Sequence, residues 1–187
     1  MTELAYSTVD KSSWGSGEWQ DEPDKIQWRD ETTGLACLAN RGPGGHWCGY
    51  VGVPPGHPAH GMDYDRVYDL FGDYDSDSYL DVHGGLTYAA ECAHGPEESS
   101  ICHVPEPGEP DNVWWLGFDC AHSGDLSPSR AARDRERYEA TGDPLWRPIE
   151  APWGPDRYRT LEYVRGQTTK LARQLAGVSN QDQREDS

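Results

Sequence analysis

Glycine and proline limit what this chain can fold into more than any other feature, because both residues interrupt regular structure. The chain holds 21 glycines and 14 prolines among 187 residues. Eight tryptophans and ten tyrosines supply aromatic surface for a core, although there are only two phenylalanines. These features predict a fold rich in strands and long ordered loops, with few helices.

A strand pattern begins at Lys25 and predicts an antiparallel meander. Ile26 and Trp28 alternate with polar residues, and apolar runs follow at 35–39, 46–53 and 113–118. A further apolar group surrounds a His-Gly-Gly turn within 80–89. Gly/Pro clusters at 42–45 and 54–58 separate the strands, since proline cannot donate to a ladder.

Three segments have the apolar spacing or start signals of helices. The first spans 63–71, with Asp63 as its N-cap. The second begins at Ser127 and Pro128. The third opens at Pro155 and closes at Gly177, and its apolar stripe consists of Tyr158, Leu161, Val164, Thr168, Leu171 and Leu175. We therefore predict an α+β fold, a mostly antiparallel sheet with this C-terminal amphipathic helix packed on it.

The domain organisation follows from polarity along the chain. Residues 1–24 are predicted to form an extended acidic arm whose two tryptophans, Trp14 and Trp19, dock on the body. Residues 25–177 are long enough for a single α+β domain. Residues 178–187 are polar and are expected to be a disordered tail.

Charge and cysteine content restrict the compartment and the partners. The net charge of −17 at pH 7 excludes a general affinity for nucleic-acid backbones or anionic lipids. No apolar stretch approaches the ~20 residues of a membrane span, and the first residues lack the pattern of a signal peptide. The odd number of cysteines, five, favours a reducing cytoplasm with free thiols or metal thiolates rather than disulfides.

All seven histidines and all five cysteines lie between Cys37 and His122. Within this window the leading candidate metal ligands are His83, Asp119, His122 and Asp125. Imidazole and carboxylate together suit zinc or manganese, and water can fill an open position. The competing interpretation is structural, with His83 capping a turn and the two aspartates holding loop backbone.

The same residues would serve a catalytic site. His83, Asp119 and His122 are the candidate acid–base groups, and metal-assisted hydrolysis of a small or nucleotide-like ligand is the natural reaction class. A ligand sponge would use the same pocket without turnover. The candidate ligand contacts are Gly84, Gly85, Thr87, Arg130 and Arg133, the glycines through close backbone approach and the arginines through phosphate.

Two weaker metal motifs compete with simpler explanations. A thiolate zinc clip would use Cys92, His94, Cys102 and His103. It lacks the usual C-x₂₋₄-C spacing, and buried cysteines acting as small apolar residues compete with it. The Asp73-x-Asp75-x-Asp77 run is no EF-hand, because Ser78 and Gly84 stand where glycine and glutamate are needed.

The segment 63–81 is an acidic band interleaved with tyrosines. Its aspartates are Asp63, Asp65, Asp69, Asp73, Asp75, Asp77 and Asp81. Such a surface is complementary to a basic protein groove. The alternative function is therefore a non-enzymatic inhibitor or decoy that binds a basic host protein, against the simpler interpretation of a solvated acidic loop.

Four strings in the chain resemble a family of small acidic proteins from actinobacterial phages and prophages, to which no activity is assigned. They are GHWCGYVGV at 45–53, VHGGLTY at 82–88, WWLGFDCAHSGD at 114–125 and LEYV at 161–164. The resemblance covers roughly residues 6–176. It implies a phage accessory protein in the host cytoplasm, and it transfers no catalytic residue.

Overall fold

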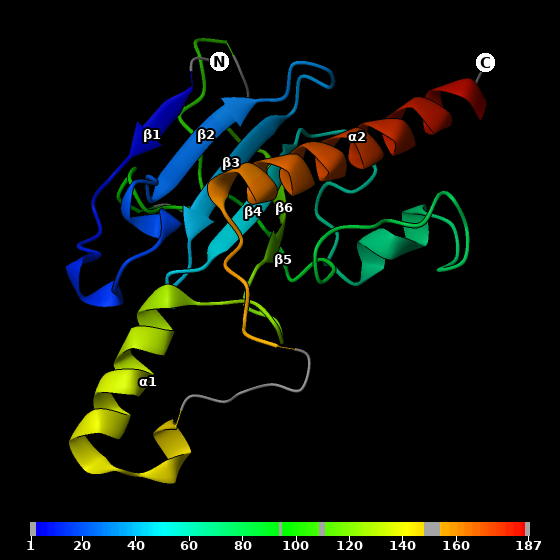
Figure 1. Ribbon diagram of the computed structural model, residues 1–187. Helices are drawn as coiled ribbons and strands as arrows, with labels where there is room; N and C mark the ends of the chain where they lie inside the picture. Colours follow the sequence, from blue (N-terminus) through cyan, green and yellow to red (C-terminus); the bar gives the residue numbers. More distant parts are fainter. Residues whose placement is uncertain (1–2, 94, 109–110, 148–153, 186–187) are drawn as a thin grey trace.

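A six-stranded antiparallel sheet forms the centre of the molecule in the computed structural model (Figure 1), which describes residues 3–93, 95–108, 111–147 and 154–185. The strand order is β1-β2-β3-β4-β6-β5. The strands are β1 Leu4–Tyr6, β2 Lys25–Arg29, β3 Ala36–Arg41, β4 Trp47–Val53, β5 Tyr88–Ala90 and β6 Trp114–Asp119. The predicted α+β class with a mostly antiparallel sheet is confirmed.

Alternation along the strands divides the core between the two faces of the sheet. In β4, Trp47, Val51 and Val53 join the larger core cluster, whereas Cys48 and Tyr50 join the smaller one on the opposite face. Each pairing is antiparallel and continuous in register along β2, β3, β4 and β6. The meander predicted from Lys25 to Val53 is therefore confirmed as β2-β3-β4, whereas β6 lies between β4 and β5. The sheet carries a core cluster on each face.

Helix α2 (Leu161–Glu185) covers the first face, where it contacts β3 and β4 (Figure 1). Val164, Leu171 and Leu175 of the predicted stripe are fully buried. The helix approaches β4 closely at Gly49, where an added Cβ would lie 2.4 Å from Thr168 Oγ1. The predicted packing of this helix on the sheet is confirmed.

The predicted limits of this helix are wrong. It begins at Leu161 rather than Pro155, because the backbone of Arg157 pairs with the backbone at Gly124 and Leu126 instead of turning helically. It does not end at Gly177, and its backbone continues through Glu185. A helix of this length tolerates a glycine at a cost of about 1 kcal/mol.

The loop 95–104 packs on the second face of the sheet. The buried side chain of Lys25 donates to the carbonyl oxygens of Glu97 and Cys102. Gln27 exchanges two hydrogen bonds with the backbone of Val104. These contacts bury two polar side chains of β2 against loop backbone, which satisfies both partners.

The remaining elements are short or lie outside the sheet. Helix α1 (Pro128–Thr141) begins after Ser127 as predicted and extends away from the sheet (Figure 1). The segment predicted as a helix over 63–71 forms only the 3₁₀-helix η3 (Arg66–Leu70). The other 3₁₀-helices are η1 Ser12–Trp14, η2 Glu18–Gln20 and η4 Pro144–Trp146.

The N-terminal segment contributes strand β1, and it packs on the body. Trp19 is buried against Tyr158, with ring centroids 5.2 Å apart, and the Trp14 ring lies 5.8 Å from the Arg41 guanidinium. The predicted docking of both tryptophans is confirmed. Asp24 is buried between Lys11 and Arg41, at 2.8 and 3.1 Å, so buried ion pairs join this segment to β3.

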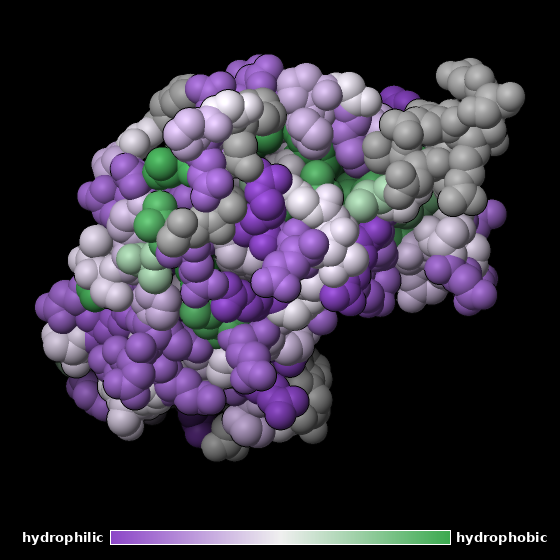
Figure 2. Space-filling model, turned by 90° about the horizontal axis from the view of Figure 1, so that it is seen from above, coloured by the Kyte–Doolittle hydropathy of each residue, from purple (hydrophilic) through white to green (hydrophobic). Residues whose placement is uncertain are grey.

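The surface is dominated by polar side chains, as the charge predicts. Figure 2 shows one face on which hydrophilic residues prevail and hydrophobic ones form small separate groups. No helix within the described ranges is long and apolar enough to cross a membrane.

Candidate metal centre

Two turns that are distant in sequence meet beside the start of α2. His83 lies in the turn before β5, and His122 and Asp125 lie in the turn after β6. One nitrogen of each histidine and one carboxylate oxygen of Asp125 all lie within 4.8 Å of one another. The expectation from the sequence that these two loops meet is confirmed, whereas a binding or catalytic role for them stays a prediction.

Asp125 is the buried centre of the cluster, with 2% of its side chain exposed. Its Oδ2 lies 2.7 Å from His83 Nε2 and accepts the His122 backbone N–H at 3.2 Å. Its Oδ1 accepts Arg159 Nε–H at 2.7 Å. Burial raises the pKa of the Asp125 carboxyl, but the hydrogen bonds from Arg159 and His83 outweigh burial and hold that pKa below its ordinary value.

His83 is held at both ring nitrogens. Its Nδ1 lies 2.9 Å from the Tyr163 hydroxyl, and its backbone N–H donates to Gln167 Oε1 at 3.1 Å. The rings of His83 and Tyr163 pack edge to face with centroids 5.6 Å apart. Helix α2 therefore fixes the orientation of the imidazole, and burial raises the pKa of the Tyr163 hydroxyl while Arg159 opposes that rise.

His122 has one ring nitrogen without a hydrogen bond. Its side chain is 36% exposed, yet Nδ1 is buried and has no hydrogen-bond partner among the residues that the structure describes. The nearest carboxylate oxygens are Asp125 Oδ2 at 3.7 Å and Asp119 Oδ1 at 3.8 Å. Both distances exceed those of a hydrogen bond, so this nitrogen faces two carboxylates across a gap.

Gly84 makes room for the His122 ring. An added Cβ at Gly84 would lie 2.1 to 2.6 Å from three ring atoms of His122. Both Gly84 and Gly85 have positive φ angles, 66° and 86°, in the left-handed region that favours glycine. At Gly84 the close neighbour is the His122 side chain, whereas an added Cβ at Gly85 would lie 3.1 Å from the Tyr68 hydroxyl; the predicted approach of a ligand to these glycines stays a prediction.

Asp119, the fourth predicted ligand, stands outside the group of three. Its Oδ1 accepts the Ala121 backbone N–H at 3.0 Å, which makes it the acceptor of a local turn. Its side chain is 30% exposed and lies at the edge of the cluster beside His122. Three of the four predicted metal ligands therefore belong to the group that could hold an ion, and Asp119 does not.

The predicted ligand contacts are mostly elsewhere. Thr87 is exposed, and its N–H donates to the carbonyl oxygen of Gly117 in β6. Arg130 and Arg133 lie on α1, and Arg130 pairs with Asp134 of the same helix at 3.8 Å. Within the described ranges, no contact joins either arginine to the cluster. The arginine at the site is Arg159, which sequence reasoning missed.

Tyr163 was also missed as a site residue. The one signal that could have identified both residues is their position near the start of the predicted C-terminal helix, next to Tyr158 and Leu161 of its apolar stripe. That signal does not specify which loops the helix start contacts.

The cysteines correct one prediction. Cys92 and Cys102 form a disulfide with Cα atoms 4.8 Å apart, a separation typical of such bonds. The expectation of no disulfides is therefore wrong, and the predicted thiolate clip is unavailable to these two sulfurs. His103 packs against Trp115 at 5.5 Å between ring centroids, and His94 lies outside the described residues.

The remaining thiols are poor nucleophiles. Cys37, Cys48 and Cys120 are free and buried. Burial raises the pKa of the Cys37 and Cys48 thiols to about 12, and it raises that of Cys120 further. Because the thiolate is the reactive form, these cysteines act as apolar core residues. A disulfide is more typical of oxidising compartments, so the cysteines no longer support the predicted reducing one.

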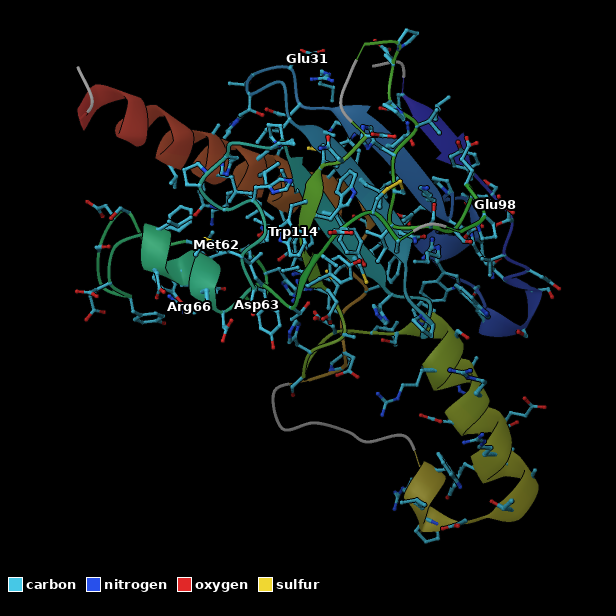
Figure 3. All side chains as sticks on the ribbon, turned by 180° about the vertical axis from the view of Figure 1, so that it is seen from behind. Glu31, Met62, Asp63, Arg66, Glu98 and Trp114 are labelled. Carbon is cyan, nitrogen blue, oxygen red and sulfur yellow. A yellow bond between two sulfur atoms is a disulfide. The ribbon has the colours of Figure 1, made fainter. Side chains whose placement is uncertain are left out.

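The acidic side chains of the band 63–81 face solvent, although Val67 and Leu80 of the same segment are buried. All seven of its aspartates are exposed, and Tyr74 is 79% exposed. Figure 3 shows Asp63 and Arg66 on the segment at the margin of the molecule, outside the sheet. Arg66 pairs with Asp69 at 2.7 Å, and Lys170 pairs with Asp81, so part of the negative charge is already compensated.

Comparison with protein-family models, with curated proteins and with solved structures finds no match to this chain. The resemblance to actinobacterial phage proteins stays a prediction.

Proposed function

We propose that the protein binds a divalent metal ion through His83 Nε2, His122 Nδ1 and Asp125 Oδ2. The observation that carries this proposal is the buried, unpartnered His122 Nδ1, 3.7 Å from a carboxylate oxygen. A buried nitrogen without a hydrogen bond lowers the stability of the fold. A metal ion bound by both His122 Nδ1 and the Asp125 carboxylate would give that nitrogen a partner. Two imidazoles and one carboxylate are a ligand set of catalytic zinc, so zinc is the first choice and manganese the second.

The surrounding contacts are those that metal ligands require. When Nε2 of His83 binds the ion, its Nδ1–H donates to the Tyr163 hydroxyl 2.9 Å away. When Oδ2 of Asp125 binds the ion, Oδ1 remains bonded to Arg159 at 2.7 Å. Such outer contacts fix the tautomer and the direction of each ligand. They support a metal centre over a simple turn cap.

Three protein ligands leave a fourth position for water, as in catalytic zinc sites. Of the three proposed ligands His122 has the most exposed side chain, at 36%, although its Nδ1 is buried. A bound ion would lower the pKa of its water to about 7, and we assign Asp119, beside His122, as the carboxylate that would accept the released proton. The reaction class is metal-assisted hydrolysis of a small or nucleotide-like substrate.

Calorimetric titration of untagged protein with Zn²⁺, and separately with Mn²⁺, tests metal binding. Wild type should bind one ion, and His122→Gln should weaken binding at least about 100-fold because a ligand is lost. The matched control is His60→Gln, at a histidine outside the cluster whose ring bonds to the Asn112 carbonyl oxygen and packs near Trp114. Equal affinities in the two variants would contradict the proposal.

Turnover is a separate measurement. Zn²⁺-loaded protein is incubated with nucleoside mono-, di- and triphosphates, and the products are followed by chromatography. Hydrolysis that falls in Asp119→Asn while Zn²⁺ affinity is unchanged supports catalysis with Asp119 as the base. Retention and intact recovery of the nucleotide would identify a sponge instead.

The acidic band supports the alternative function less well. Its aspartates are solvated, and two of them already have cationic partners. A decoy predicts association with a basic protein that weakens steeply with salt. It also predicts loss of that association when Asp73, Asp75 and Asp77 are all changed to asparagine, with zinc binding intact.

A further inference from the structure

Arg159 lies beside the proposed ion position as a second positive charge. This charge restricts which molecules the site can bind. Asp125 joins the two: Oδ2 faces the proposed ion, and Oδ1 accepts Arg159 Nε–H at 2.7 Å. The guanidinium also lies 5.0 Å from the centre of the Tyr163 ring. Arg159 is therefore held on two sides, by a carboxylate and by an aromatic face.

Part of the Arg159 head group remains available to a ligand. Its side chain is 24% exposed, and Nε makes its hydrogen bond within the protein. Across the described ranges, Nη1 and Nη2 have no hydrogen-bond partner. A guanidinium fixed at one edge with free donors at the other is suited to the oxygens of a phosphoryl group.

The charges of the loaded site favour an anion. The imidazoles bind an ion in their neutral form, Asp125 and Asp119 contribute one negative charge each, and Arg159 and a divalent ion contribute three positive ones. The site then has a net charge of about +1 on a chain whose net charge is −17. An anionic ligand is drawn to this position and repelled from the surrounding surface.

We propose that the site binds a phosphoryl group, with one oxygen on the metal ion and another on Arg159; this rests on the metal centre proposed above. On this proposal Arg159 makes the phosphate contact that the sequence led us to expect from Arg130 and Arg133. The ligand class is inorganic phosphate or a small phosphate monoester, whose tetrahedral oxygens can reach both cations across the Asp125 carboxylate.

The test uses Co²⁺-loaded full-length protein, because the visible spectrum of Co²⁺ reports ligands at its open position. Inorganic phosphate is titrated into wild type, Arg159→Gln and the matched control Arg157→Gln, whose side chain is exposed two residues away. Wild type and Arg157→Gln should show the same saturable spectral change. Arg159→Gln should bind phosphate at least about tenfold more weakly, the loss expected for a charged hydrogen bond.

The outcomes separate the two proposals. If wild type takes up no Co²⁺, the metal centre itself fails. If Co²⁺ binds but phosphate leaves the spectrum unchanged, or if Arg159→Gln binds phosphate as tightly as Arg157→Gln, the phosphoryl site is overturned while the metal centre stands. Acetate binding tighter than phosphate would also overturn it.

Arg159→Gln could instead lose Co²⁺, because Arg159 also holds Asp125. Arg159→Lys then decides, since it keeps the cation and loses the planar fork. Retained Co²⁺ with phosphate binding weakened at least about threefold supports the proposal, and unchanged phosphate binding overturns it.

Discussion

Replacing Gly84 by alanine should displace His122 and abolish metal binding. The new Cβ would lie 2.1 Å from His122 Cε1 and 2.5 Å from Nδ1, whereas carbon atoms in contact stay about 3.5 Å apart. The ring must therefore move by more than about 1 Å, and metal–ligand distances tolerate only about 0.2 Å. Zn²⁺ affinity should fall at least about 100-fold, beyond the usual effect of outer-shell changes.

The same substitution also strains the backbone, and a second glycine isolates that effect. Gly61 has a φ of 82° and nothing within 4 Å of an added Cβ, so Gly61→Ala should lose only the left-handed preference, about 1–2 kcal/mol of unfolding free energy. Urea denaturation measures the strain in both variants, and competition with a chromophoric chelator measures zinc affinity. If Gly84→Ala bound Zn²⁺ as tightly as Gly61→Ala, His122 would not be a ligand.

Three further changes test the fold around the site. Changing both Cys92 and Cys102 to serine should lower the free energy of unfolding by about 3 kcal/mol for a loop of this length, and wild type in reductant should unfold in urea like the variant. Burial raises the pKa of the Asp24 carboxyl, but hydrogen bonds from Lys11 and two backbone N–H groups outweigh burial and lower that pKa. The stability that the Asp24 carboxylate contributes should therefore be present above pH about 4 and be lost as the pH falls through the folded pKa. Thermal melting at several pH values should show a weaker pH dependence for Asp24→Asn. Glu22→Gln breaks a buried pair with Arg41 and should cost about 3 kcal/mol in urea denaturation, whereas Glu18→Gln in the neighbouring exposed position should cost little.

Periodicity revealed the elements that bury a regular face, and it failed where tertiary contacts set the boundary. Alternation around Ile26 and Trp28 and the stripe from Val164 to Leu175 identified β2 and α2, because burial imposes a period on each. Strand β1 has three residues, which are too few for a pattern. The start of α2 was misplaced because Arg157 pairs with a loop that follows β6, a contact that local sequence does not encode.

The sequence likewise revealed some residues of the candidate site and missed others. The concentration of histidines in one part of the chain, next to small residues, indicated His83, His122 and Asp125. Asp119 was grouped with them by spacing alone, and its carboxylate instead accepts a backbone N–H two residues on, which an aspartate after a strand commonly does. Arg159 lies 34 residues after Asp125 in the sequence. No spacing rule connects two residues so far apart.

A single half-buried carboxylate explains how the N-terminal segment helps to position α2. Glu22 Oε1 accepts the backbone N–H of Leu161, the first residue of α2, at 2.7 Å, and Oε2 accepts Trp47 Nε1–H at 2.9 Å. Because a negative charge at a helix start is favourable, this contact fixes where α2 begins relative to β4. Arg159 and Tyr163 lie two residues on either side of Leu161, so their reach to Asp125 and His83 depends on a residue from the opposite end of the chain. The metal centre is accordingly a property of the assembled fold, and neither of its two loops should bind an ion when excised as a peptide.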